Sequence, residues 1–565
     1  MEVNATEKKQ PKHRTKKAAV ASKNGKQAVV IQELVLDLGA PGLTPLLRAG
    51  LGGLASSLRS LAIEDQPTTR WPAPVKLADG TATVESRRVI FQFGPKGPVP
   101  FLEKLFARVF RISREGAIAP RGVLDPLQPV NLGLQIALQL GMKRTFLQHG
   151  KSTTKSGSPK LLAVEIDDRT LRYSLQPYSG FSHQDGASQI AEAITKGTVD
   201  LAGWAYPGAA QKHVGLSETK CDYSPVEAVC AFFALVGCIS LPTARGGGGV
   251  LVIPHPTDLV AFAVTRPRLT PRTVADAHVT GLGDAMLALS LALRLDEIAA
   301  ARRGVSGADG VLLRALPWAT QQKSRAWTLE IGAVDDARLD AYDAVVKTLP
   351  SRIRESTERD DDDASDGFYV AASALRGFVT ENLASGPSRR WYSDFATATT
   401  GGKKPRFIHY YRDKAEGKGL GALYPEEKKG LITMLDNLEH AELTLVRSVH
   451  VALRQRFAQI ADESEGAQAT MKNRFKGERD RWRIAFAGAK THDQIRNALA
   501  DLWSRAGANK ELREGWECLL PLLRSDRWQS ARDLALVALA SYQGKSAGID
   551  DDDHGEPPAG AQRSK

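Results

Sequence analysis

Residues 224–241 read SPVEAVCAFFALVGCISL, and this stretch decides the fold class. It is apolar almost throughout, which predicts a buried helix that runs directly into a strand. A glycine loop leading into a second strand follows at 246–259, GGGGVLVIPHPTDL. The apolar run at 228–241 is too short to span a bilayer comfortably. The middle of the chain is therefore predicted to mix helices and strands in a soluble fold.

Strand and helix signals alternate on both sides of this stretch. KLLAVEIDDRTLRYSL at 160–175 predicts a hairpin that turns near Asp167–Arg169. LTPLLRAGLGGLASSLRSLA at 43–62 is typical of a helix, and its glycines are interpreted as merely tolerated there. The other strand signals lie at 28–38 and 85–94, and the other helix signals at 100–113 and 284–303.

The C-terminal third is predicted to be helical. An acidic run at 355–367 marks an exposed loop or a linker, and beyond it the only strand signal is PRFIHYY at 405–411. A long helix is expected at 431–460. Thr491 with Gln494 forms a capping-box pattern, and Gly507 is placed to close the helix that follows.

We therefore expect an α+β protein, with a mixed α/β N-terminal region followed by an all-α C-terminal helical bundle. A disordered basic tail should precede these regions and a disordered acidic tail should follow them. The predicted segments are 1–27 for the basic tail, 28–354 for the mixed α/β body, 355–430 for the acidic linker and a basic aromatic segment, 431–544 for the bundle and 545–565 for the last tail.

Length, charge and cysteine content limit the possible functions. The chain has 565 residues, which suggests two to four domains, and a net charge of +12, which favours polyanionic partners. The positive charge concentrates in 1–27, 389–429 and 471–545, and the rest of the chain is net acidic. No CxxC pair occurs among the four cysteines, and no secretory signal follows the basic start. These features predict a reduced, cytoplasmic protein without a membrane segment.

Sequence motifs for catalysis or metal binding are weak. His492-Asp493 is a lone pair at a helix start, for which a helix-cap role is favoured over a metal site. The aspartate runs at 360–363 and 551–553 are interpreted as solvated loops. ARGGGGVLVIP at 244–254 lacks the Lys-Ser/Thr of a phosphate-binding P-loop and precedes a strand rather than a helix. We expect no catalytic residue, no metal and no cofactor.

Basic segments with interleaved aromatic residues remain as candidate nucleic-acid contacts. At 388–430, Trp391, Tyr392, Tyr410 and Tyr411 either stack on bases or pack in the bundle core, and neither reading is favoured. The helix at 524–544, with Ser525 as its expected N-cap, and the loop at 151–160 add two more basic surfaces. The candidate residues are Lys151, Lys155, Lys160, Arg245, Arg389, Arg390, Lys403, Lys404, Arg406, Arg412, Arg479, Arg483, Arg524 and Arg527.

Five stretches resemble one known family, in the order in which that family has them. They are LGAPGLTPLLRAGLGGLASSLRSL, HVGLSETKCDYSPVEAVCAFFALVGCISL, RRWYSDF, RFIHYYRDKAEGKGLGAL and DRWQSARDLALVALASY. The chain resembles the large subunit of type I CRISPR interference complexes (Cascade) in the Cas-eight family, of an I-A-like or closely related branch. The resemblance covers roughly 30–544, and it carries no motif-reading residue onto a numbered position.

The resemblance implies a non-catalytic subunit of a CRISPR RNA-guided complex in antiviral defence. Such a subunit recognises the protospacer-adjacent motif in double-stranded DNA, aids strand separation and docks a helicase-nuclease beside other Cascade subunits. A free-standing nucleic-acid-binding regulator is the alternative. An internal start at Met434 or Met471 would yield the bundle as a separate small subunit, and the sequence leaves this open.

Overall fold

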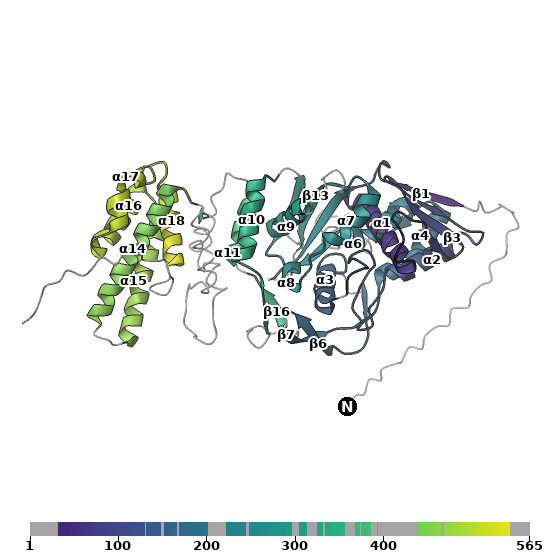
Figure 1. The fold of residues 1–565 in the computed structure, drawn as a ribbon, viewed down its shortest axis with the longest axis horizontal. Helices are drawn as coiled ribbons and strands as arrows, with labels where there is room; N and C mark the ends of the chain where they lie inside the picture. The colour runs from purple at the N-terminus through teal and green to yellow at the C-terminus, as the bar shows by residue number, and fades with distance from the viewer. Residues whose placement is uncertain are drawn as a thin grey trace, which may run out of the picture.

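The computed structural model combines a mixed region of helices and small antiparallel sheets with a helical C-terminal region (Figure 1). The predicted α+β fold class is therefore confirmed. Figure 1 shows the C-terminal helices, in green and yellow, at one end of the molecule. The structure describes residues 32–129, 131–148, 152–166, 169–201, 222–244, 248–295, 304–313, 325–330, 334–355, 368–372, 374–385, 392–393, 438–464 and 468–542.

The first sheet is antiparallel with the strand order β1-β4-β3-β2. Both strands predicted in this part of the chain are confirmed, with shorter bounds. Val89 and Phe91 alternate with exposed or half-buried neighbours along β4, and the ring of Phe91 lies 5.0 Å from that of Phe101 on α2. The bounds are β1 Glu33–Asp37, β2 Val75–Leu77, β3 Gly80–Val84, β4 Arg88–Gln92 and α2 Pro98–Val109.

Helices α1 (Pro45–Asp65) and α6 (Pro225–Gly237) form the central helix pair of the mixed region. Glycines lie where the two backbones meet. A Cβ on Gly50 would overlap the carbonyl oxygen of Cys230, and a Cβ on Gly237 would overlap that of Ala49. The interpretation of the α1 glycines as merely tolerated is therefore wrong, because the close approach of α6 requires them.

Small strand pairs and short helices connect the two main sheets. Strands β6 and β7 form the expected hairpin, with Ile166 opposite Arg169. Lys155 lies in a strand rather than in the predicted loop, because β5 pairs with β8. The bounds are α3 Leu132–Arg144, β5 Thr153–Lys155, β6 Lys160–Ile166, β7 Arg169–Leu175, β8 Tyr178–Phe181, α4 Gly186–Lys196, β9 Val199–Asp200 and β10 Asp222–Tyr223.

The second sheet is antiparallel in the order β11-β12-β13-β14. The stretch at 224–241 forms α6 and then β11, as predicted, with only Cys238 between them. Helix α9 packs against β12 and β13 through buried leucines. The bounds are β11 Ile239–Pro242, β12 Gly249–Pro256, α7 Leu259–Arg268, α8 Val274–Ala277, α9 Leu282–Leu295, β13 Val305–Leu313 and β14 Arg325–Glu330.

A buried ion pair ties α9 to α10 (Asp336–Thr348) and α11 (Ala374–Ser385). The Arg376 guanidinium lies 2.9 Å from the Asp284 carboxylate, and the Tyr342 hydroxyl donates to the same carboxylate at 2.8 Å. All three side chains are almost fully buried. Burial raises the pKa of Tyr342 well above its ordinary value, so the phenol stays a neutral donor. The arrangement satisfies every buried charge, which is the condition for tolerating charge in a core.

Strands β15 (Arg352–Glu355) and β16 (Phe368–Ala371) flank the acidic run. They pair antiparallel, with Glu355 opposite Phe368. The expectation of no strand between the acidic run and PRFIHYY is therefore wrong at β16. Its pairing partner precedes the acidic run, which explains why local sequence gave a weak signal.

Within the described residues, five helices form the C-terminal bundle around one hydrophobic cluster. Thr491 caps α16 by accepting the Gln494 N–H, and Gly507 ends that helix with φ 89°, both as predicted. The Gln494 side chain accepts from Lys490 instead of completing the capping box with Thr491. The bounds are α14 His440–Glu463, α15 Gln468–Gly488, α16 His492–Ala506, α17 Lys510–Leu519 and α18 Trp528–Ser541.

Helix α14 supplies a large part of the bundle core, including Leu445, Val449 and Leu453. Met471 lies inside α15, so a chain started there would lack α14 and its core side chains. Met434 precedes α14 and lies outside the described residues. Of the two internal starts, only Met434 leaves all five described helices intact.

His450 has a structural role within this bundle. Its Nε2 lies 3.0 Å from the carbonyl oxygen of Ala538 and 2.9 Å from the hydroxyl of Ser541, which joins α14 to α18. Burial lowers the pKa of His450 to about 4. The folded bundle therefore holds a neutral imidazole, whereas the unfolded chain binds a proton below the ordinary pKa of 6.5.

Acidification should destabilise the bundle through His450. The stability that the buried neutral imidazole contributes is complete above pH 6.5. It is lost as the pH falls towards the lowered pKa of about 4. From about pH 7 to about pH 5 the expected loss is about 2 kcal/mol. The measurement is urea unfolding of wild type and His450→Gln at both pH values, with exposed His440→Gln as control. An equal pH dependence in wild type and His450→Gln would contradict this account.

Candidate nucleic-acid interface

The structure places six of the predicted contact residues. Lys155 at the end of β5 and Lys160 at the start of β6 are both exposed. The four others, Arg479, Arg483, Arg524 and Arg527, belong to the bundle. The remaining candidates lie outside the described residues: Lys151, Arg245, Arg389, Arg390, Lys403, Lys404, Arg406 and Arg412.

Arg479 and Arg483 lie one turn apart on α15 but in different surroundings. Arg483 is exposed and lies 3.4 Å from the Asp480 carboxylate. Arg479 is half-buried near Tyr542, and burial lowers its pKa. Phe475 and Trp482 pack against the bundle, since Trp482 is buried and the Phe475 ring lies 5.0 Å from that of Phe457.

Arg524 and Arg527 precede α18 and differ in how far their charge is compensated. Arg524 is exposed. The Arg527 guanidinium lies 3.6 Å from the Glu439 carboxylate and 3.9 Å from that of Glu442. The helix begins at Trp528, so the prediction of Ser525 as N-cap is wrong. A phosphate at Arg527 would have to compete with two carboxylates.

The structure shows whether Tyr392 of the basic aromatic segment packs in the bundle core or is free to stack on a base. Its side chain is 1% exposed and belongs to the hydrophobic cluster of the bundle. Its hydroxyl donates to the buried Glu442 carboxylate at 2.8 Å. Tyr392 therefore packs and does not stack on a base, whereas Trp391, Tyr410 and Tyr411 lie outside the described residues.

An arginine cluster in the mixed region escaped the sequence analysis. Arg108, Arg111 and Arg121 converge on Glu64 at the end of α1. Arg108 also makes a bidentate pair with Asp65, at 2.7 and 3.0 Å. Three guanidiniums thus share two carboxylates, which leaves excess positive charge at a partly exposed surface.

The loop that carries Arg121 is fixed to α1. The Ser56 hydroxyl donates to the carbonyl of Gly122 at 2.8 Å, and the Ser57 hydroxyl donates to that of Arg121 at 2.9 Å. Burial lowers the pKa of Arg121, against the opposing effect of Glu64. A guanidinium held on rigid backbone loses little conformational entropy when it binds an anion. We name Arg108, Arg111 and Arg121 the α1 arginine cluster.

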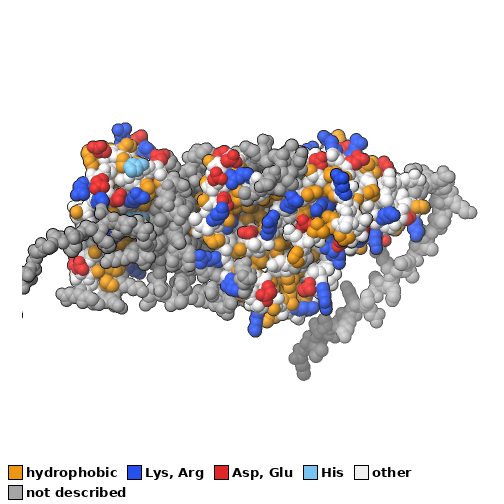
Figure 2. Space-filling model, viewed as in Figure 1, with side chains coloured by type: hydrophobic (Ala, Val, Ile, Leu, Met, Phe, Trp, Pro, Cys, Tyr) orange, Lys and Arg blue, Asp and Glu red, His pale blue; other side chains and the backbone are white. Residues whose placement is uncertain are grey.

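Basic side chains are otherwise dispersed. On the face in Figure 2, Lys and Arg alternate with Asp and Glu over the described parts of both regions. Arg59 and Arg268 lie near each other beside Asp125, and burial followed by repulsion from Arg268 lowers the pKa of Arg59.

Comparison with known proteins connects this geometry to a family. A family model described as the DevT N-terminal domain matches residues 35–232, and one described as the DevT C-terminal domain matches 435–562. The CRISPR-associated protein Cas8a1/Csx13 of Myxococcus xanthus (strain DK1622) is 46% identical over 542 residues, which cover 95% of this chain and 93% of that protein. This chain belongs to the Cas8 family. The resemblance found in the sequence is confirmed.

The two DevT matches fall on the two structural regions of this Cas8-family chain, the mixed region and the helical bundle. The N-terminal model spans the α1 arginine cluster, and the C-terminal model spans all five bundle helices. Arg479, Arg483, Arg524 and Arg527 lie within the C-terminal match. Both candidate surfaces are therefore parts of recognised family domains.

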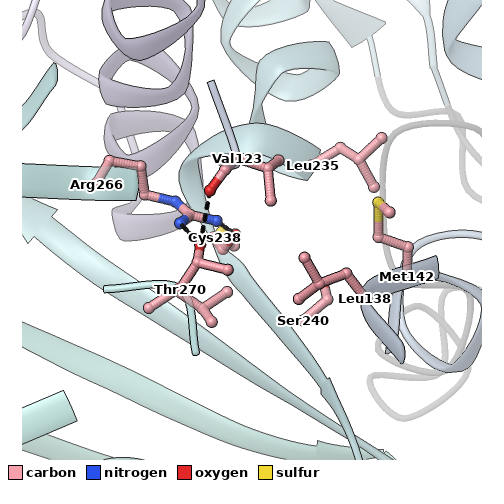
Figure 3. A pocket seen from close by; sticks show the side chains of 9 residues that line it. Val123, Leu138, Met142, Leu235, Cys238, Ser240, Arg266 and Thr270 are labelled. Carbon is pink, nitrogen blue, oxygen red and sulfur yellow. Dashed lines mark hydrogen bonds between the residues drawn. The ribbon is translucent and has the colours of Figure 1, made fainter. Parts of the chain in front are cut away.

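A small cavity lies beside α6 (Figure 3). Its volume is about 10 Å³, room for one water molecule at most. Arg266 points to the end of α6 and hydrogen-bonds with Thr270, while Leu138 and Met142 line the opposite side. Burial raises the pKa of the Cys238 thiol to about 12, so it stays protonated. The cavity is too small for a nucleotide.

Neither a metal cluster nor a membrane span is present in the described parts of this Cas8-family protein. They contain no group of three or more His, Cys, Asp or Glu side chains placed to hold a metal ion. None of the described helices is long and apolar enough to cross a membrane. His492 begins α16 and hydrogen-bonds with the carbonyl of Leu523, and Asp493 follows in the first turn.

Proposed function

We propose that this protein is the non-catalytic large subunit of a CRISPR RNA-guided surveillance complex in the cytoplasm. It recognises the protospacer-adjacent motif in target double-stranded DNA, aids strand separation and recruits a helicase-nuclease in antiviral defence. The observation that carries the proposal is 46% identity to Cas8a1/Csx13 along almost the whole length of both chains. Its partners are CRISPR RNA, target DNA, the helicase-nuclease and the other Cascade subunits.

The exposed basic side chains of this protein meet the physical requirements for binding DNA in a guide-directed complex. In such complexes base pairing with the guide selects the sequence, while the protein reads the adjacent motif and grips the backbone. Backbone grip needs arginines and lysines on rigid elements and no nucleophile. The α1 arginine cluster and the exposed Lys155 and Lys160 offer such groups in the mixed region, and Arg483 and Arg524 in the bundle.

The test begins with tagged full-length protein purified from its native cells. Sequencing of the co-purified RNA should give repeat-spacer RNAs of uniform length, together with several further subunits. In this assembly, Arg111→Gln should weaken binding of a target duplex about threefold to tenfold at about 100 mM salt. The slope of log K against log salt should fall by about one, because one phosphate contact is lost.

Arg88→Gln is the matched control. Arg88 is 55% exposed and pairs with Asp37, much as Arg111 is 49% exposed and pairs with Glu64. The control should leave affinity and salt slope unchanged, and equal effects of the two variants would remove the α1 arginine cluster from the interface. Heterogeneous RNA, with tight binding by the purified monomer, would favour the free-standing regulator instead.

A further inference from the structure

The strand pairs β5–β8 and β6–β7 join into one antiparallel ribbon. Between the two pairs, the Ser156 N–H donates to the carbonyl of Pro177 at 2.8 Å, and the Gln176 side chain donates to that of Gly157 at 3.0 Å. Figure 1 shows β6 and β7 beside β16 at the lower edge of the mixed region. The ribbon thus has fixed geometry at a border of the molecule.

One face of the β6–β7 part of the ribbon packs on the rest of the protein. Val164 and Leu171 are buried on this inner face, and Val164 lies against Gly133 of α3. Tyr173 shares the inner face with Leu171, because they lie two residues apart on β7. The Tyr173 ring contacts that of Phe368 on β16 at 5.1 Å. Both α3 and β16 therefore contact the inner face, and the outer face is two strands wide.

The outer face presents three long side chains to solvent. Leu161 is 63% exposed and lies opposite the smaller Ser174. Arg172 is exposed, and within the described residues no carboxylate lies at ion-pair distance from it. Glu165 is exposed and accepts a hydrogen bond from the Thr170 hydroxyl at 2.6 Å. An apolar group, a guanidinium and a carboxylate are therefore available on one narrow face.

Two lysines lie where this face ends. Lys155 is the last residue of β5 and Lys160 the first of β6, and both are exposed. Within the part of the chain that the structure describes, neither lysine has an ion-pair partner. The turn at Asp167–Asp168, outside the described residues, follows the opposite end of β6. Positive charge is thus placed at the end of the ribbon away from these aspartates.

We propose that the outer face of β6–β7 enters the major groove of the target duplex and reads the protospacer-adjacent motif there. This inference rests on the proposed function and adds the surface and chemistry of the reading. The major groove is about 12 Å wide and admits a two-stranded ribbon. Arg172 donates to guanine N7 and O6, Glu165 accepts from the cytosine amino group, and Leu161 contacts a thymine methyl group. Lys155 and Lys160 bind the flanking phosphates.

The first experiment uses the assembled complex with a library of target duplexes, randomised next to the guide-paired segment. Sequencing of the bound fraction gives the base preference at each position. Arg172→Gln should lower the preference for guanine about tenfold at one position and leave the other positions unchanged. Lys160→Gln should instead weaken binding of all sequences about threefold and lower the slope of log K against log salt by about one.

Arg48→Gln is the matched control. Arg48 is also exposed and has no ion-pair partner among the described residues, but it lies in the first turn of α1. This variant should keep the wild-type preferences. If the wild-type complex prefers certain bases and Arg172→Gln keeps the same preferences, the inference is wrong and the proposed function stands. If the wild-type complex binds all sequences alike, both motif reading and this inference are wrong.

A second experiment identifies the groove. In the preferred duplex, 7-deazaguanine removes the N7 acceptor from the major groove, whereas inosine removes the amino group of guanine from the minor groove. The 7-deazaguanine duplex should bind less tightly to the wild-type complex, about threefold or more, and equally well to the Arg172→Gln complex. Inosine should have no effect on either complex. A loss with inosine but not with 7-deazaguanine would place the reading in the minor groove and overturn the proposal.

Discussion

Replacing Gly50 by alanine should destabilise the mixed region by about 3 kcal/mol or more, although alanine is the better helix former. In an isolated helix the change would stabilise by about 1 kcal/mol. Here the new Cβ would overlap the carbonyl group of Cys230 on α6, and a backbone carbonyl cannot rotate away as a side chain can. The two helices would have to separate, which would open the largest core of the protein.

Gly477→Ala provides the matched control for this effect. Gly477 lies inside α15, and a Cβ there would meet no atom within 4 Å. We expect it to stabilise the bundle by about 0.5–1 kcal/mol, from helix propensity alone. Urea unfolding followed by circular dichroism measures both variants. If Gly50→Ala were neutral or stabilising, the close contact of α1 and α6 would be wrong.

The glycines of α1 show where sequence reasoning about the fold stops. Apolar spacing correctly predicted the helix at 43–62, because that signal is local. The partner of the helix lies at 225–237, and nothing near Gly50 in the sequence indicates it. Strand β16 was missed for the same reason, since its pairing partner β15 lies beyond the acidic run. Local periodicity predicts elements, whereas packing depends on distant parts of the chain.

Prediction of the candidate interface from the sequence is limited in the same way, because it also depends on residues that are distant in the chain. Charge runs are visible in sequence, and they led to Arg524 and Arg527 together. The structure separates them, because Glu439 and Glu442 approach only Arg527. The α1 arginine cluster escaped notice because its parts come from two helices and a loop, with Glu64 and Arg121 far apart in the chain. No local count of basic residues finds such a cluster.

Arg266 is the most deeply buried arginine among the described residues, and its guanidinium hydrogen-bonds through all three nitrogens. Its side chain donates to the carbonyl oxygens of Val236 and Gly237, at 2.7 and 3.0 Å. It also donates to the carbonyl oxygen of Cys238 at 2.7 Å and to the Thr270 hydroxyl at 2.8 Å (Figure 3). These carbonyls end α6, where the helix dipole places partial negative charge. Burial lowers the pKa of Arg266 to about 10, so it is still protonated at neutral pH.

Arg266→Leu should therefore cost about 4 kcal/mol or more, because three carbonyls at the end of α6 would lose their donor in a dry core. Arg266→Lys should recover only part of this loss, since an ammonium cannot reproduce the planar fork of the guanidinium. The control is Arg268→Leu, two residues along the chain at an exposed position, which should change stability by less than about 0.5 kcal/mol. Urea unfolding of the three variants decides the matter. Equal stability of Arg266→Leu and Arg268→Leu would mean that the end of α6 does not need its buried cation.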